Sequence, residues 1–100
     1  MIRSKKITNA ARGEDCTLEI VGVCNGNNET VVFAHFKDEQ KGMGMKSSDV
    51  SGAFCCAACH DVVDGRVYNE GYAGFSDWYM RRATNRTLER LFEIGVLKVA

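Results

Sequence analysis

Five cysteines are spaced along the 100-residue chain in a pattern that favours metal binding over disulfide bonding. Seven residues separate Cys16 from Cys24, and Cys56 and Cys59 form a C-x2-C pair that His60 follows directly. A disulfide framework normally needs an even number of cysteines and an oxidising compartment, and the basic N-terminal residues lack the apolar core of a signal peptide. We therefore expect one structural Zn2+ bound by the thiolates of Cys16, Cys24, Cys56 and Cys59.

This choice of four ligands leaves three alternatives open. Buried free cysteines can act simply as small apolar residues. Cys55 adjoins Cys56 and could replace it, but the spacing of Cys56 to Cys59 is the one that closes a knuckle, so we expect Cys55 to pack inward. His60 could also take the place of one cysteine in the zinc site.

Length and composition indicate a single globular domain. The 100 residues are 45% hydrophobic and 26% charged, which are ordinary values for such a domain. No run approaches the ~18 consecutive apolar residues of a membrane span. We therefore expect a cytoplasmic protein with no membrane partner.

Charge is distributed unevenly although the formal net charge is zero. Residues 1–12 carry four basic side chains and no acidic one, and residues 81–100 carry five basic and two acidic ones. The other eleven acidic residues lie in the middle of the chain. A zero net charge argues against a nucleic-acid partner, but basic ends around an acidic, metal-binding centre suit a nuclease.

Local sequence patterns predict an α+β fold. β-Branched and aromatic residues are concentrated at 30–36, and the polar, glycine-containing segment 37–48 is predicted to be a loop. The basic segment 1–13 is expected to be a loosely ordered arm. The predicted elements, in chain order, are strands at 17–21, 30–36 and 50–55 and helices at 57–64 and 76–93.

The C-terminal helix is predicted to begin with Ser76 as its N-cap and to end before Gly95. Its apolar residues are expected to face the core, although a platform of aromatic rings that stacks nucleic-acid bases is an open alternative. Its arginines form either a solvated face or phosphate contacts. The residues of this region expected in the core are Phe75, Trp78, Tyr79, Leu88, Leu91 and Phe92.

The order of these features resembles the HNH, or ββα-metal, nucleases that are braced by a structural zinc. A cysteine pair precedes a strand that ends in His35, and a glycine-containing loop then leads to Cys56-x-x-Cys59-His60 and a helix. A closer resemblance, which spans nearly the whole chain, is to the small prophage-encoded YbcO-like nucleases. The segments that carry it are Ala10-Ala11-Arg12-Gly13, Val23-Cys24-Asn25-Gly26-Asn27, Ala34-His35, Cys56-Ala57-Ala58-Cys59-His60-Asp61, Gly71-Tyr72-Ala73 and Gly95-Val96-Leu97-Lys98.

The resemblance implies a small zinc-stapled ββα-metal domain with an additional C-terminal helix. Residues 1–100 would form a single HNH-like domain with a basic arm at 1–13, a zinc-braced core at 16–66 and a helical extension at 70–100. It also implies a metal-dependent endonuclease that acts on nucleic acid, with DNA as the favoured substrate. Such a protein would be encoded by a phage or prophage and would act in the cytoplasm of the bacterial host.

The resemblance also implies roles for individual residues. The histidine that deprotonates water in HNH nucleases corresponds to His35, and the helix residues that hold a divalent cation such as Mg2+ or Mn2+ correspond to His60 and Asp64. Asp49 lies near the position of the family's central asparagine and is expected to brace the loop. The position before His35 is Ala34, which offers no metal ligand. The basic residues expected to contact nucleic acid are Lys46 and Arg66.

Two other function classes compete with a metal-dependent endonuclease. Ala34 suits a zinc-stapled nucleic-acid-binding module that has lost catalysis. A phage-encoded adaptor that binds a host protein would use zinc only as a structural staple. Salt-sensitive binding of nucleic acid separates the first two classes from the adaptor, and dependence of cleavage on His35 separates the nuclease from the binding module.

Overall fold

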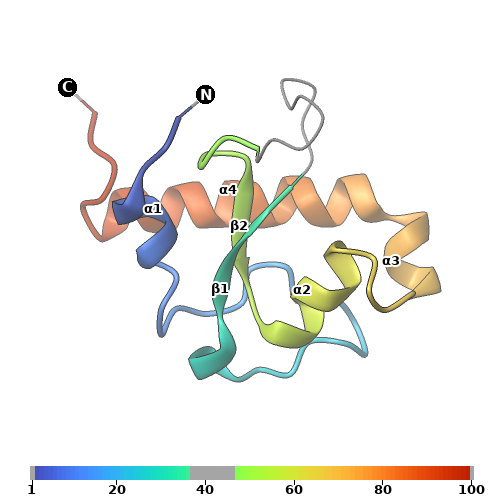
Figure 1. The fold of residues 1–100 in the computed structure, drawn as a ribbon. Coiled ribbons are helices and arrows are strands. Elements are labelled where there is room, and N and C mark those ends of the chain that lie inside the picture. Colours follow the sequence, from blue (N-terminus) through green and yellow to red (C-terminus); the bar gives the residue numbers. More distant parts are fainter. Residues whose placement is uncertain (1, 37–46, 100) are drawn as a thin grey trace.

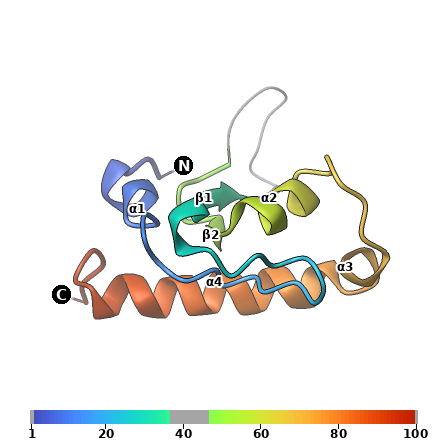
Figure 2. The same cartoon turned by 90° about the horizontal axis from the view of Figure 1, so that it is seen from below.

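The computed structural model describes residues 2–36 and 47–99 and is built around a two-stranded antiparallel sheet (Figure 1). The sheet consists of β1 (Val32–His35) and β2 (Gly52–Cys55), and the long helix α4 (Ser76–Glu93) runs along one side of it (Figure 2). The other elements are α1 (Lys5–Asn9), the 3-10 turn Asn28–Thr30, α2 (Ala57–Val63) and α3 (Glu70–Gly74). The predicted α+β class is confirmed, and most of the predicted loop at 37–48 lies outside the described residues.

The two strands pair in a register that places His35 opposite Gly52. A side chain at Gly52 would overlap the carbonyl oxygen of Ala34 and the ring of Phe33. Glycine at this position therefore allows the close approach of the strands at the end where His35 lies. The pairing continues beyond β1, because the Phe36 N–H donates a hydrogen bond to a carbonyl oxygen of the opposite segment at 2.8 Å.

The outer edge of β2 is covered by two threonines instead of a third strand. The Thr17 N–H donates to the carbonyl oxygen of Phe54 at 2.8 Å, and the Phe54 N–H donates to Thr87 Oγ1 at 3.1 Å. The two threonine hydroxyls are 3.2 Å apart and share a further hydrogen bond. Both edges of β2 are therefore occupied, one by β1 and the other by residue 17 and α4.

Residues 17–21 form no strand, so the prediction for this segment was wrong. Leu18 and Ile20 are buried and Val21 is 82% exposed, so the alternation that suggested a strand is present as a pattern of burial. The backbone is irregular, however, because Glu19 has φ 46°. A residue in that left-handed region cannot continue a β-ladder.

The arginines of α4 hold this irregular segment against the helix. Arg82 Nη2 donates to the carbonyl oxygen of Leu18 at 2.8 Å, and Arg90 Nε donates to the carboxylate of Glu14 at 2.6 Å. These contacts hold residues 14–19 against α4. The sequence left open two other roles for the α4 arginines, a solvated face and phosphate binding.

The basic N-terminal segment is folded, although it was expected to be loosely ordered. Residues Lys5–Asn9 form α1, whose first turn is capped by Ser4 Oγ accepting the Ile7 N–H at 3.4 Å. Ile7 and Ala11 are 3% and 1% exposed and belong to the core. Two buried apolar residues one turn apart therefore fix a segment in which charge dominates the local sequence.

The helices predicted at 57–64 and 76–93 are present as α2 and α4, and α4 has the predicted bounds. Gly65 and Gly95 follow them with φ 81° and 79°, the left-handed conformation that ends many helices. The N-cap of α4 is Phe75 and not Ser76, and its side chain makes no capping hydrogen bond. Each helix in the described part of the chain is too short or too polar to cross a bilayer.

The apolar residues predicted to lie in the core at α4 are only partly buried. Tyr79 and Leu91 are 7% and 1% exposed, as expected. Phe75, Trp78 and Phe92 are 66%, 54% and 46% exposed, so the prediction was wrong for these three. The physical reason is visible in Figure 2, where the rest of the chain covers one side of α4 only.

Candidate functional site

Four cysteines from three segments of the chain meet in one cluster. The Sγ atoms of Cys16, Cys24, Cys56 and Cys59 all lie within 4.8 Å of one another, and those of Cys24 and Cys56 are 3.9 Å apart. Thiolates that bind Zn2+ tetrahedrally at ~2.3 Å would be about 3.8 Å apart, so the cluster fits this ion closely. The donor set, four thiols and no carboxylate, is also the one that Zn2+ favours in structural sites.

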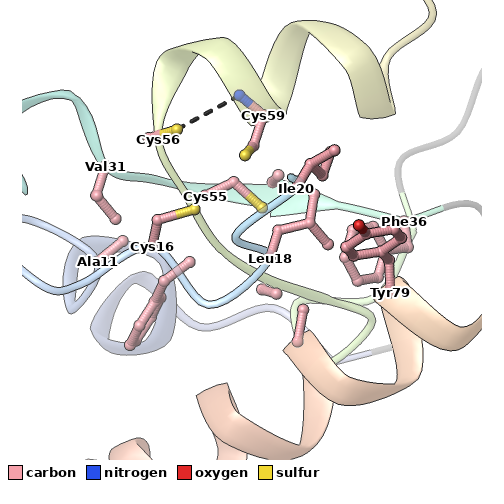
Figure 3. Close-up of a cluster of buried hydrophobic side chains, with 14 of the residues drawn as sticks. Ala11, Cys16, Leu18, Ile20, Val31, Phe36, Cys55, Cys56, Cys59 and Tyr79 are labelled. Atoms are coloured by element: carbon pink, nitrogen blue, oxygen red, sulfur yellow. Dashed lines mark hydrogen bonds between the residues drawn. The ribbon is translucent and has the colours of Figure 1, made fainter. Parts of the chain in front are cut away.

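Local backbone geometry directs these sulfur atoms toward one another. Cys56 is the N-cap of α2, and its Sγ accepts the Cys59 N–H at 3.4 Å, the bond drawn as a dashed line in Figure 3. Cys24 follows a turn in which its N–H donates to the carbonyl oxygen of Ile20 at 3.0 Å. The helix start and the turn thus present the cysteines from two sides, and Cys16, the residue directly before the irregular segment, completes the group.

The pKa values of the clustered thiols indicate a site suited to a cation. A hydrogen bond from the Cys59 thiol lowers the pKa of Cys16 to about 4, although burial opposes this shift. Burial raises the pKa of Cys24 to about 11, and the hydrogen bond to Cys16, together with burial, raises the pKa of Cys59. The neighbours of Cys16 therefore stabilise its thiolate, and a bound cation would favour ionisation of Cys24 and Cys59 as well.

Cys55 and His60, the two alternative zinc ligands, lie outside this cluster. Cys55 is fully buried in β2, and burial raises its pKa well above the usual range, so it packs as an apolar residue. His60 lies on α2, where its Nε2 is 3.1 Å from Asp64 Oδ2. The geometry therefore favours the four ligands expected from the spacing.

His35, at the end of β1, contacts Asp49. His35 Nε2 is 2.8 Å from Asp49 Oδ1, and the imidazole and the Phe33 ring pack in a T-shaped arrangement with their centroids 5.1 Å apart. Burial alone would raise the pKa of Asp49, but hydrogen bonds from His35 and from the Ser4 N–H, with the charge of Arg3, lower it. The structure thus joins the expected base and the expected loop brace in one hydrogen-bonded pair.

The N-terminal residues form part of this site, which sequence reasoning had not predicted. The Ser4 N–H donates to Asp49 Oδ2 at 2.6 Å, the Asp49 N–H donates to the carbonyl oxygen of Ile2 at 2.8 Å, and Arg3 Nη1 is 3.9 Å from Asp49 Oδ1. The one local signal was Ser4 at a helix N-cap position, which fixes the start of α1 but does not indicate a distant partner.

At the C-terminal end of α2, the side chains of His60, Asp64 and Arg66 form a second polar group. Besides the His60 contact, Asp64 Oδ2 lies 3.0 Å from Arg66 Nη2, and Arg66 Nε donates to Asp61 Oδ1 at 3.0 Å. The expected pair of cation ligands is therefore in contact. Within residues 2–36 and 47–99, however, the four cysteines are the one set of three or more potential metal ligands that converge. Lys46 lies outside the described residues.

The fold and these sites define a small α+β protein with a four-cysteine cluster that can hold a metal ion. A family model described as "Putative nuclease YbcO" matches residues 5–96. The chain therefore belongs to the YbcO family, and the predicted resemblance to that family is confirmed.

Individual relatives agree with this membership. "Putative nuclease YbcO" of Escherichia coli (strain K12) is 46% identical over 67 residues, which cover 64% of this chain and 70% of the relative. "Putative nuclease ybcO" of Enterobacteria phage 82 matches with the same values. A solved structure described as "a putative bacteriophage protein from Escherichia coli str. K-12 substr. MG1655" has a TM-score of 0.70 and 35% identity, covering 88% of this chain and 98% of that one.

Proposed function

We propose that the protein is a metal-dependent endonuclease of the HNH type that hydrolyses phosphodiester bonds, with DNA as its favoured substrate. The observation that carries the proposal is the His35–Asp49 pair at the end of β1, at 2.8 Å. The names of the relatives, which describe nucleases, support the reaction class. The order of strand-end histidine, cysteine knuckle and helix along the chain supports the HNH type.

His35 has the surroundings that a general base requires. The ionised Asp49 accepts a hydrogen bond from His35 Nε2, and this assigns the ring proton to Nε2. Nδ1 then carries the lone pair, and it forms no hydrogen bond within the part of the chain that the structure describes. In the proposed reaction Nδ1 takes a proton from the attacking water, and Asp49 stabilises the imidazolium that results.

His60 and Asp64 are the proposed ligands of the divalent cation, Mg2+ or Mn2+. They lie one turn apart on α2 and in contact, so both can reach a common ion. The cation would stabilise negative charge on the phosphate and on the leaving oxygen. Arg66, which contacts Asp64, and Lys46 are assigned to phosphate binding.

The zinc proposed for the four-cysteine cluster has a structural role. Cys56 and Cys59 belong to the first turn of α2, so a metal bound there fixes the start of the helix that carries His60 and Asp64. The proposal therefore separates two metals by function, one that holds α2 in place and one that assists the reaction.

One observation favours a second candidate, a nucleic-acid-binding module without catalysis. Ala34, which precedes the proposed base, is fully buried and offers no ligand, so His60 and Asp64 are the two ligands proposed for the second ion among the described residues. This candidate keeps salt-sensitive binding of nucleic acid and makes His35 dispensable.

A plasmid-nicking assay with and without added Mg2+ or Mn2+ tests the proposal. Wild type should nick only with the cation, and His35→Ala should lose ~10²–10⁴-fold in rate because it removes the general base. Val32→Ala, a half-exposed position on the same strand, is the matched control and should retain the rate. No cleavage of DNA or RNA by wild type would favour the binding module, and full activity of His35→Ala would refute the assigned base.

A further inference from the structure

The start of α4 presents exposed aromatic rings that the proposed site does not use. Phe75 and Trp78 are 66% and 54% exposed. Phe75 is the N-cap of α4 and Trp78 lies in its first turn, so both rings stand at the start of the helix. Together with Tyr79 they line an open groove of about 330 Å³. We call the surface formed by Phe75, Trp78 and Tyr79 the aromatic platform.

Trp78 is held in place although its ring faces solvent. The guanidinium carbon of Arg82 lies 4.4 Å from the centroid of the Trp78 ring, and Arg82 is itself anchored to the carbonyl oxygen of Leu18 at 2.8 Å. The rings of Tyr79 and Trp78 pack in a T-shaped arrangement with their centroids 5.1 Å apart. Because the ring is already ordered, a ligand that stacks on it meets a small entropy cost.

The charges around the platform suit an anionic ligand. Arg81 is exposed three residues after Trp78, next to Arg82, and it takes part in none of the ion pairs formed between described residues. Asp77 is an exposed acidic neighbour that opposes them. Exposed aromatic faces beside arginine side chains are the combination by which proteins bind single-stranded nucleic acid, whose unpaired bases stack while its phosphates pair with the cations.

We propose that the aromatic platform binds unpaired bases of single-stranded nucleic acid, with Arg81 neutralising a neighbouring phosphate. A duplex conceals the faces of its bases, so the platform selects substrates that contain unpaired nucleotides. This inference rests on the proposed function in taking nucleic acid as the substrate, and it adds the class of nucleic acid and the surface that recognises it.

The chain contains a single tryptophan, so its fluorescence reports directly on the platform. The His35→Ala protein, used without added divalent cation to prevent cleavage, is titrated with oligothymidylate and with a blunt duplex of equal length. Oligothymidylate should quench the fluorescence to saturation, and the duplex should quench it far less. In anisotropy measurements with labelled oligothymidylate, Trp78→Ala and Phe75→Ala should each weaken binding about 5- to 150-fold.

Phe92→Ala is the matched control, because Phe92 is a 46% exposed aromatic residue at the other end of the same helix. It should leave the binding of oligothymidylate unchanged. Absence of quenching, equal quenching by duplex, or an equal loss of binding in Phe92→Ala would overturn the proposal. A dimer in sedimentation that becomes monomeric in Trp78→Ala would do so too, since the surface would then be occupied by a second copy of the chain.

The outcomes separate this inference from the proposed function. Cation-dependent nicking without binding through Trp78 would leave the nuclease proposal intact and refute the platform. Binding through Trp78 without cleavage of any nucleic acid would support the platform and favour the binding module over the nuclease.

Discussion

Asp49 retains its charge at a position where it is only 8% exposed, because donors reach it from separate parts of the chain. The Ser4 N–H that binds it lies 45 residues away in the sequence. The family pattern predicted both His35 and a bracing role for Asp49, but no local pattern could indicate that the first residues of the chain complete the pair. The contact is tertiary and is fixed by the docking of α1.

The substitution Asp49→Asn should separate the charge of this residue from its shape. The amide can still contact His35 but cannot stabilise an imidazolium ion, so the rate of nicking should fall by about 10²-fold or more while the fold persists. Circular dichroism and zinc content provide the control for folding. An unchanged rate would show that nicking does not need the charge of Asp49.

The same variant should alter the dependence of stability on acid. The fold lowers the pKa of Asp49 below its ordinary value of 3.8, so the stabilisation from its charge is complete above about pH 4 and is lost as pH falls through the folded pKa. The difference in melting temperature between wild type and Asp49→Asn should therefore shrink below about pH 4. The comparison is made over the pH range in which elemental analysis shows zinc retained by both proteins. A difference independent of pH would contradict the assignment.

At the scale of elements, the sequence predicted α4 with its correct bounds but not what the helix contacts. The buried Tyr79 and Leu91 follow from helical periodicity, whereas the exposure of Trp78 depends on how much chain is available to cover the helix. The false strand at 17–21 has a related cause. Leu18 and Ile20 alternate in burial as strand residues do, but the carbonyl oxygen of Leu18 accepts from Arg82 of α4 instead of from a neighbouring strand.

Thr87→Val tests the attachment of α4 to the sheet. Valine has nearly the same shape but cannot accept the Phe54 N–H, so a buried backbone donor would be left without a partner, which costs about 1–3 kcal/mol of unfolding free energy. Urea unfolding measures the loss. Thr84→Val, three residues earlier and more exposed, is the matched control and should change stability by no more than about 0.5 kcal/mol. Equal effects of the two substitutions would show that the hydrogen bond is not responsible.

At the scale of the whole molecule, the four-cysteine cluster connects three segments that lie far apart along the chain. It joins the residue before the irregular segment, the turn at 21–24 and the start of α2. The spacing of the cysteines predicted this group, because a C-x2-C pair at a helix start and a second pair beside a turn can converge on one tetrahedral ion. The packing of α4 against residues 14–19 could not be predicted from the sequence. It depends on tertiary contacts of the α4 arginines with this segment.

Cys59→Ser should unfold the protein or make it insoluble, whereas Cys55→Ala should retain the fold and about one zinc per chain. Structural zinc contributes on the order of 10–16 kcal/mol in small domains, which is comparable to the ~5–15 kcal/mol net stability of a domain. Cys55→Ala removes a buried sulfur outside the cluster and should cost at most ~3 kcal/mol. Elemental analysis and circular dichroism check both, and zinc lost in Cys55→Ala but retained in Cys59→Ser would reverse the assignment.

The hydrogen bonds that enclose Phe54 also set the order in which backbone amides exchange with solvent. The Phe54 N–H is bonded to Thr87 and its residue is fully buried, so it can exchange only when α4 leaves the sheet and the core opens with it. The Ser4 N–H needs only the separation of the N-terminal segment from Asp49. In deuterium oxide the Phe54 proton should be among the last to disappear, and its exchange rate should report the free energy of global unfolding. Loss of this proton as early as that of Ser4 would instead show that α4 can detach while the rest of the molecule stays folded.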